Sequence, residues 1–188
     1  MTRPRGFLLS CAFALLALAG PAAAQDEGKL TITGTVIQVG GSLSGQSLPI
    51  TIQIDRANTP AQLQSYFQTL KTQGQDGLFK AVEKEKLGFV AISGKTGNDI
   101  HAVRVRDTPA GKHYTLLLER WINFGEARYA GRSLDYKFSI LQFVLRADGK
   151  GEGKAMYMVK IKMKKDGSIE MEHYGTYPAN LVGLMVRK

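Results

Sequence analysis

The sequence predicts an α+β domain, mostly an antiparallel curved sheet or partial barrel, with two short helices inserted after the second strand. The first observation is a series of nine segments rich in β-branched and aromatic residues, separated by short turns of Gly, Asp, Asn and Pro. Short connections between consecutive strands favour antiparallel pairing. The second observation is a change of apolar spacing after the second segment, from every second residue to every third or fourth.

Alternation of apolar and polar residues places the strands along the chain. In the second strand Ile50, Ile52 and Ile54 fall on one face, as expected for a strand with one buried side. The nine predicted strands are Lys29–Val39, Pro49–Asp55, Phe89–Ser93, Ile100–Arg106, His113–Ile122, Tyr136–Ala147, Gly153–Lys165, Ser168–Tyr174 and Asn180–Val186.

The first helix has a clear start. Thr59 suits the N-cap, Pro60 suits the first helical position, and Gln62 completes a capping box. Gly74 is a natural end of this helix. The apolar stripe between these limits consists of Leu63, Tyr66, Phe67 and Leu70.

A second cap at Asp76 predicts another short helix that ends at Gly88. Its apolar stripe is Leu78, Phe79 and Val82, so the two helices are expected to pack as a pair over the sheet. The lysines of this segment also fit an amphipathic membrane-binding pair, but glutamates alternate with them and favour the packed pair.

The hairpin near the C-terminus can be predicted to its register. A two-residue Asp-Gly loop would place glutamates opposite Ile161 and Met163. A three-residue loop, Lys165–Gly167, places Met171 and Ile169 there instead and keeps each face consistent. We therefore predict the three-residue loop, with its glycine in the left-handed conformation.

This register bears on nucleic-acid binding. Lys160, Lys162 and Lys164 resemble a basic stripe in the linear sequence. The predicted register sets Glu172 against Lys160 and Glu170 against Lys162, which partly neutralises the stripe. No nucleic-acid partner is expected.

The N-terminus has the three parts of a secretory signal peptide. Arg3 and Arg5 precede the apolar run Phe7–Leu18, which is too short to span a bilayer, and Ala22–Ala24 offers small residues to signal peptidase. We predict cleavage before Gln25, one domain over residues 25–188, a secreted or periplasmic location, and no transmembrane segment in the mature chain. An uncleaved membrane anchor is the alternative.

Removal of this peptide changes the chemistry of the chain. The single cysteine, Cys11, leaves with it, so the mature chain has no thiol and no disulfide. Lipidation at Cys11 is rejected because the cysteine precedes most of the apolar run. The formal net charge of +9 falls by two and stays positive, which favours an anionic polymer or surface as partner, although solubility alone can explain it.

Known catalytic and metal-binding patterns are not found in the sequence. The stretch Ser93–Gly97 resembles a phosphate-binding loop but lacks the required preceding glycine and the following helix. The three histidines, His101, His113 and His173, are distributed over separate strands. We predict no catalytic residue, no metal site and no cofactor.

The densest run of polar and aromatic side chains is Arg120–Tyr136, which contains the single tryptophan. It fits a plain connection between two strands, with Trp121 buried, or a binding loop. It also fits an active site in which two carboxylates act as acid and base and two arginines hold an anion. The candidate binding residues are Arg120, Glu126, Arg128, Arg132 and Asp135.

Four segments resemble a family of small exported bacterial proteins of acidobacterial type. They are "GQDGLFKAVEKEKLG", "FGEARYAGRSLDYKFSI", "GKGEGKAMYMVKIKMKKDG" and "IEMEHYGTYPANL". The resemblance covers most of the mature chain and implies secretion and a shared fold. It implies no activity, and no site residue follows from it.

The sequence therefore favours an exported soluble protein with a non-catalytic binding or envelope-associated role. One alternative is a secreted hydrolase that uses Glu126, Asp135, Arg128 and Arg132. Another is a protein that docks on an anionic membrane or polymer through Arg104, Arg106 and the lysine strand.

Overall fold

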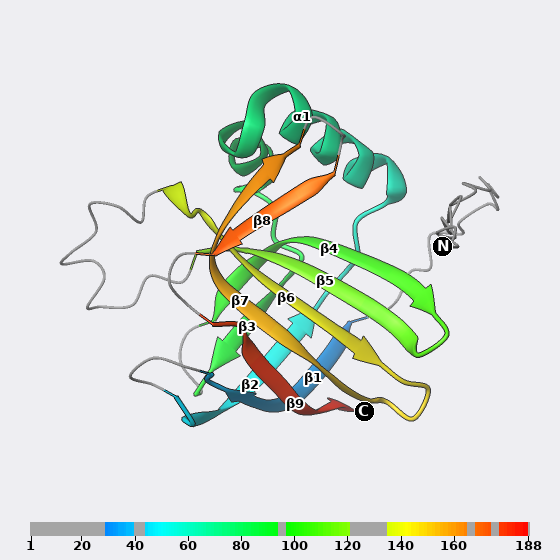
Figure 1. Cartoon of the computed structure of the whole chain (residues 1–188). Coiled ribbons are helices and arrows are strands. Elements are labelled where there is room, and N and C mark those ends of the chain that lie inside the picture. The colour runs from blue at the N-terminus through cyan, green and yellow to red at the C-terminus, as the bar shows by residue number, and fades with distance from the viewer. Residues whose placement is uncertain are drawn as a thin grey trace, which may run out of the picture.

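The computed structural model describes residues 29–39, 44–93, 97–120, 135–164, 168–173 and 177–187. It confirms an α+β fold dominated by antiparallel strands, and each of the nine predicted strands is present (Figure 1). The elements are β1 Leu30–Ile37, β2 Ser47–Ile54, α1 Pro60–Val82, β3 Gly88–Ile92, β4 Asn98–Thr108, β5 Gly111–Glu119, β6 Phe138–Leu145, β7 Lys150–Met163, β8 Ile169–His173 and β9 Ala179–Arg187.

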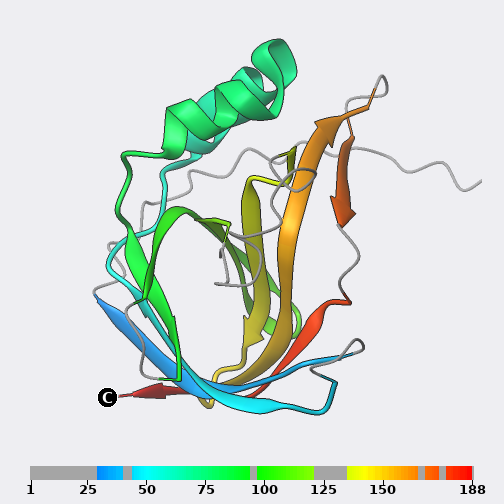
Figure 2. The same ribbon diagram turned by 90° about the vertical axis from the view of Figure 1, so that its left-hand side faces the viewer.

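Eight of these strands close into a barrel. The strand order is β6-β5-β4-β3-β2-β1-β9-β7, and a further pairing of β6 with β7 completes the ring. β8 pairs with β7 and stays outside the ring, beside the upper part of β7 (Figure 2). The curved sheet predicted from the sequence is thus a closed barrel with one additional edge strand.

The helical insertion forms one helix, so the prediction of two separate helices was wrong. The predicted capping box of Thr59 and Gln62 is present at its start. Gly74 leaves helical geometry, with φ 69° and ψ −166°, but the helix resumes at once and continues to Val82. A single glycine therefore produces a kink within one helix, because the residues on both sides keep helical geometry.

The barrel interior is filled by aliphatic and aromatic side chains. Val103, Leu116, Leu141 and Ala155 are successive cross-strand partners on β4 to β7, and each is fully buried. They belong to a core cluster that also includes residues of β1, β2, β3 and β9. Because side chains fill the interior, a binding site is expected on the outer surface of the barrel.

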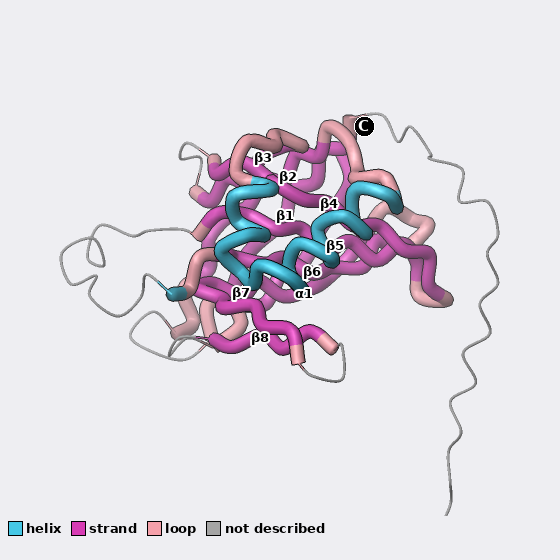
Figure 3. The backbone as a smooth tube through the Cα atoms, turned by 90° about the horizontal axis from the view of Figure 1, so that it is seen from above, coloured by secondary structure: helices cyan, strands magenta, loops and turns pink. Residues whose placement is uncertain are grey.

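A second apolar cluster lies on the opposite face of the same strands. It joins α1 to β6 and β7, and Figure 3 shows the helix lying across this part of the sheet. Phe138 is fully buried here, and its ring lies 6.0 Å from that of Phe79. The members of the cluster are Leu70, Leu78, Val82, Phe138, Ile140, Met156, Val159 and Ile161.

The hairpin of β7 and β8 has the predicted register. Ile161 pairs with Met171, and Met163 pairs with Ile169. The backbone N–H of Lys164 donates to the carbonyl of Ser168 at 2.8 Å, which closes a loop of three residues. Gly167 itself lies outside the described residues.

Candidate functional site

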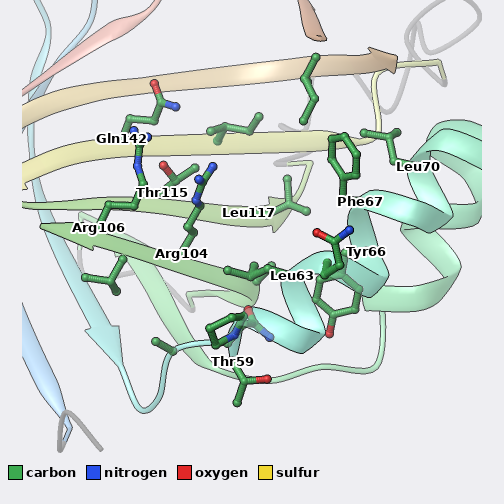
Figure 4. A pocket seen from close by; sticks show the side chains of 18 of the residues that line it. Thr59, Leu63, Tyr66, Phe67, Leu70, Arg104, Arg106, Thr115, Leu117 and Gln142 are labelled. Atoms are coloured by element: carbon green, nitrogen blue, oxygen red, sulfur yellow. The ribbon is translucent and has the colours of Figure 1, made fainter. Parts of the chain in front are cut away.

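A groove of about 1100 Å³ lies between the first half of α1 and the outer face of the barrel (Figure 4). Its floor is formed by outward-facing residues of β4, β5 and β6, and residues of β7 and β8 line its far side. This volume is similar to that of known small-molecule sites. We call this space the groove.

One wall of the groove is apolar. Leu63 and Phe67, one helical turn apart on α1, point toward Leu117 on β5 (Figure 4). Ile169 and Met171 of β8 also line the groove and are 49% and 37% exposed. Large apolar side chains gathered in one concavity and left accessible to solvent are typical of binding surfaces.

The other end of the groove is polar and cationic. Arg104, Thr115 and Gln142 are successive cross-strand partners on β4, β5 and β6. Arg106 follows two positions after Arg104, and both arginines line the groove. Side chains two apart on a strand share a face and are about 7 Å apart along it. We call Arg104 and Arg106 the arginine pair.

The arginine pair carries positive charge with no acidic partner among the described residues. Two other arginines have one: Arg56 lies 3.1 Å from Glu85, and Arg146 lies 3.8 Å from Asp148. Partial burial, followed by repulsion from Arg106, lowers the pKa of Arg104. An anion in the groove would oppose both effects, because it stabilises the charged form of the guanidinium.

One further charge pair lies at the cationic end of the groove. Lys112 and Asp107 also line it and stand directly opposite each other on β5 and β4. Their formal charges sum to zero, so the net formal charge of this end equals that of the arginine pair.

The lysine row, Lys160, Lys162 and Lys164 on β7, is neutralised. The three ammonium groups lie 3.1 Å from Asp135, 2.6 Å from Glu172 and 3.7 Å from Glu170, respectively. The predicted neutralisation by glutamates of β8 is therefore confirmed, although the glutamates contact diagonal neighbours rather than the lysines directly opposite.

The hydrogen bonds of Glu172 change the pKa values of the groups on this face. Hydrogen bonds from Lys162 and from the hydroxyl of Tyr136 lower the pKa of the Glu172 carboxyl. The same contact with Glu172 raises the pKa of Lys162. Both groups are thus held in their charged forms by each other.

Gln75 fixes the kinked part of α1 on the sheet. Its amide donates to the carbonyl of Asp135 at 2.6 Å, and its side-chain oxygen accepts from the backbone N–H of Ile161 at 3.0 Å. Nearby, the Asp76 carboxylate lies 2.8 Å from Lys137. Because the helix is held at its kink, the wall of the groove formed by its first half has a fixed base.

The candidate binding residues predicted in Arg120–Tyr136 are only partly described. Arg120 is buried at the end of β5, and its backbone N–H donates to the carbonyl of Lys137. Asp135 is exposed and paired with Lys160. Glu126, Arg128 and Arg132, together with Trp121, lie outside the described residues. Neither Arg120 nor Asp135 lines the groove, so their role as a binding loop stays a prediction.

His101 has a structural contact. The Nδ1 atom of His101 lies 2.8 Å from the carbonyl of Glu85, which ties β4 to the segment after α1. Within the part of the chain that the structure describes, no three side chains of His, Cys, Asp or Glu are grouped closely enough to hold a metal ion. Across the same ranges, no helix is long and apolar enough to span a membrane.

Sequence reasoning missed the groove because its apolar residues carry the signal of a core. Leu63 and Phe67 have the same helical spacing as the buried Leu70, and Ile169 and Met171 alternate like buried strand residues. The sequence does contain the signal of the arginine pair, because two arginines two positions apart on a strand predict a surface for anions.

Comparison of the chain with protein-family models, curated proteins and solved structures gives no match. The resemblance to small exported acidobacterial proteins therefore stays a prediction.

Proposed function

We propose that this chain is a non-catalytic binding protein and that its ligand, which carries an anionic group, binds in the groove. The observation that carries the proposal is the arginine pair, which lies without a described acidic partner at one end of a largely apolar groove. Guanidinium groups bind carboxylate, sulfate and phosphate through paired hydrogen bonds, and both arginines are accessible from solvent.

The chemistry of the groove favours binding over catalysis. Among its described lining residues the carboxylate is that of Asp107, which stands opposite Lys112. The described lining contains no histidine, and so it offers no base beside a nucleophile. We further propose that the protein acts outside the cytoplasm, in the periplasm or the exterior, on the strength of its N-terminal sequence pattern.

Anilinonaphthalene sulfonate tests the proposed function, since it joins apolar rings to one anionic group. We expect a saturable rise of its fluorescence with one site per chain. The double substitution Arg104→Gln with Arg106→Gln should weaken binding about tenfold or more, the equivalent of at least 1.4 kcal/mol. The matched control is Arg146→Gln with Arg187→Gln, which removes the same charge from exposed sites outside the groove. Equal weakening by both pairs would contradict the assigned site.

A further inference from the structure

The shape of the charge distribution restricts the ligand. Excess positive charge is confined to the end of the groove that holds Arg104 and Arg106. Beyond it the described floor and walls change to Leu63, Phe67 and Leu117 (Figure 4). A polymer with repeated anionic groups needs cations along its whole path, and the groove does not provide them. A ligand with one anionic end fits better.

The far end of the groove leads toward β8. Ile169 and Met171 line the groove there and are exposed despite their size. Their neighbours on the other face of β8, Glu170 and Glu172, pair with the lysine row instead. The apolar path thus continues from the first half of α1 to the edge strand, and a flexible hydrocarbon chain can follow it.

Polar groups beside the arginine pair complete a head-group site. Thr115 and Gln142 lie in the same cross-strand row as Arg104 and line the same end. A hydroxyl and an amide can each donate one hydrogen bond to an anionic oxygen that a guanidinium also holds.

We propose that the groove binds a single-chain anionic amphiphile, whose head group lies on Arg104 and Arg106 and whose hydrocarbon chain lies under α1 toward β8. This inference rests on the proposed function and names its ligand class. Carboxylate, sulfate and phosphate heads share the required chemistry. The amphiphile binds as a free molecule inside the groove, rather than as part of a bilayer.

Calorimetry with matched probes tests this ligand class. Dodecanoate, kept below its micelle concentration, should bind with one site per chain. Shortening the chain should weaken binding about fourfold for each buried methylene removed, until butanoate shows no binding. Dodecyl maltoside has the same chain and a neutral head, and it should bind more weakly than dodecanoate.

Two variants separate the head from the chain. Arg104→Gln with Arg106→Gln should lower the affinity for dodecanoate at least tenfold and leave that for dodecyl maltoside unchanged. Met171→Gln should lower the affinity for both probes. The control pair Arg146→Gln with Arg187→Gln should change neither, because these arginines do not line the groove.

The failures of the two proposals can be told apart. If anilinonaphthalene sulfonate binds through the arginine pair but affinity for the carboxylates does not depend on chain length, the amphiphile is wrong and the anion site stands. Binding to phosphatidylglycerol vesicles without binding to free dodecanoate would replace the amphiphile with a bilayer surface. Loss of binding for every probe would overturn both proposals.

Discussion

The arginine pair on β4 and the lysine row on β7 both place cations two residues apart on one face of a strand. Their surroundings differ. Every lysine of the row has a carboxylate within 3.7 Å, contributed by β8 or by Asp135. The arginine pair has none among the described residues and lies in a concavity. A basic stripe in a sequence therefore says little about binding until the neighbouring strand is known.

The largest effect is expected for the apolar cluster that packs α1, one wall of the groove, against β7, the strand of the lysine row. Phe138 is fully buried beneath α1, where the cluster holds the helix against β7. Phe138→Ala should lower the free energy of unfolding by about 3–5 kcal/mol. Phe67→Ala, in the partly exposed wall of the groove, should lower it by much less. Chemical denaturation measures both, and equal losses would show that Phe67 is a core residue.

An effect of intermediate size is expected for Gln75, which links α1 to Asp135 and to β7. Gln75→Ala leaves the N–H of Ile161 and the carbonyl of Asp135 without this partner. We expect a loss of about 1 kcal/mol in unfolding free energy, because the part-buried N–H of Ile161 loses this partner. Gln68→Ala is the control, since Gln68 is exposed on α1. Alanine has the higher helix propensity, so Gln68→Ala should cause no loss, and an equal loss there would mean that the anchor is not the cause.

A smaller effect on stability, which depends on pH, is expected for the ion pair of Glu172 with Lys162 in the lysine row. The folded pKa of Glu172 is below its ordinary value of about 4.5. Its contribution to stability is therefore complete above that value and is lost as pH falls through the folded pKa. Denaturation of the wild type and of Glu172→Gln between neutral pH and pH about 3 should show the difference in stability shrinking with acid. A difference independent of pH would mean that the ion pair is not the cause.

The smallest effect is expected for the arginine pair. Arg104→Gln removes no described ion pair and relieves repulsion from Arg106. The free energy of unfolding should change by no more than about 0.5 kcal/mol, in the direction of higher stability at low salt. A clear loss of stability would show that Arg104 has a structural role, and the contrast with the lysine row would then fail.

Local signals in the sequence predicted much of this fold. The capping box at Thr59 and Gln62 involves neighbouring residues, and the β7–β8 register follows from the requirement that both faces stay consistent. The exposure of Phe67 and Met171 depends on how far α1 lies from β8, which local spacing does not encode. Closure of the ring depends on the pairing of β6 with β7 together with β1 against β9. Of the candidate site, the sequence therefore predicts only the arginine pair.

The pairing of β1 with β9 has a consequence for the order of folding. Thr31 lies opposite Arg187, so almost the whole described chain separates two neighbouring strands. Contacts between such distant positions form slowly, because a long loop must close before they contribute. During synthesis the hairpin of β1 and β2 can form early, but the other edge of β1 stays unpaired until β9 has been synthesised. We expect the closed ring to appear only after β9 has been synthesised, and a chain that lacks β9 to leave the edges of β1 and β7 unpaired and prone to aggregation.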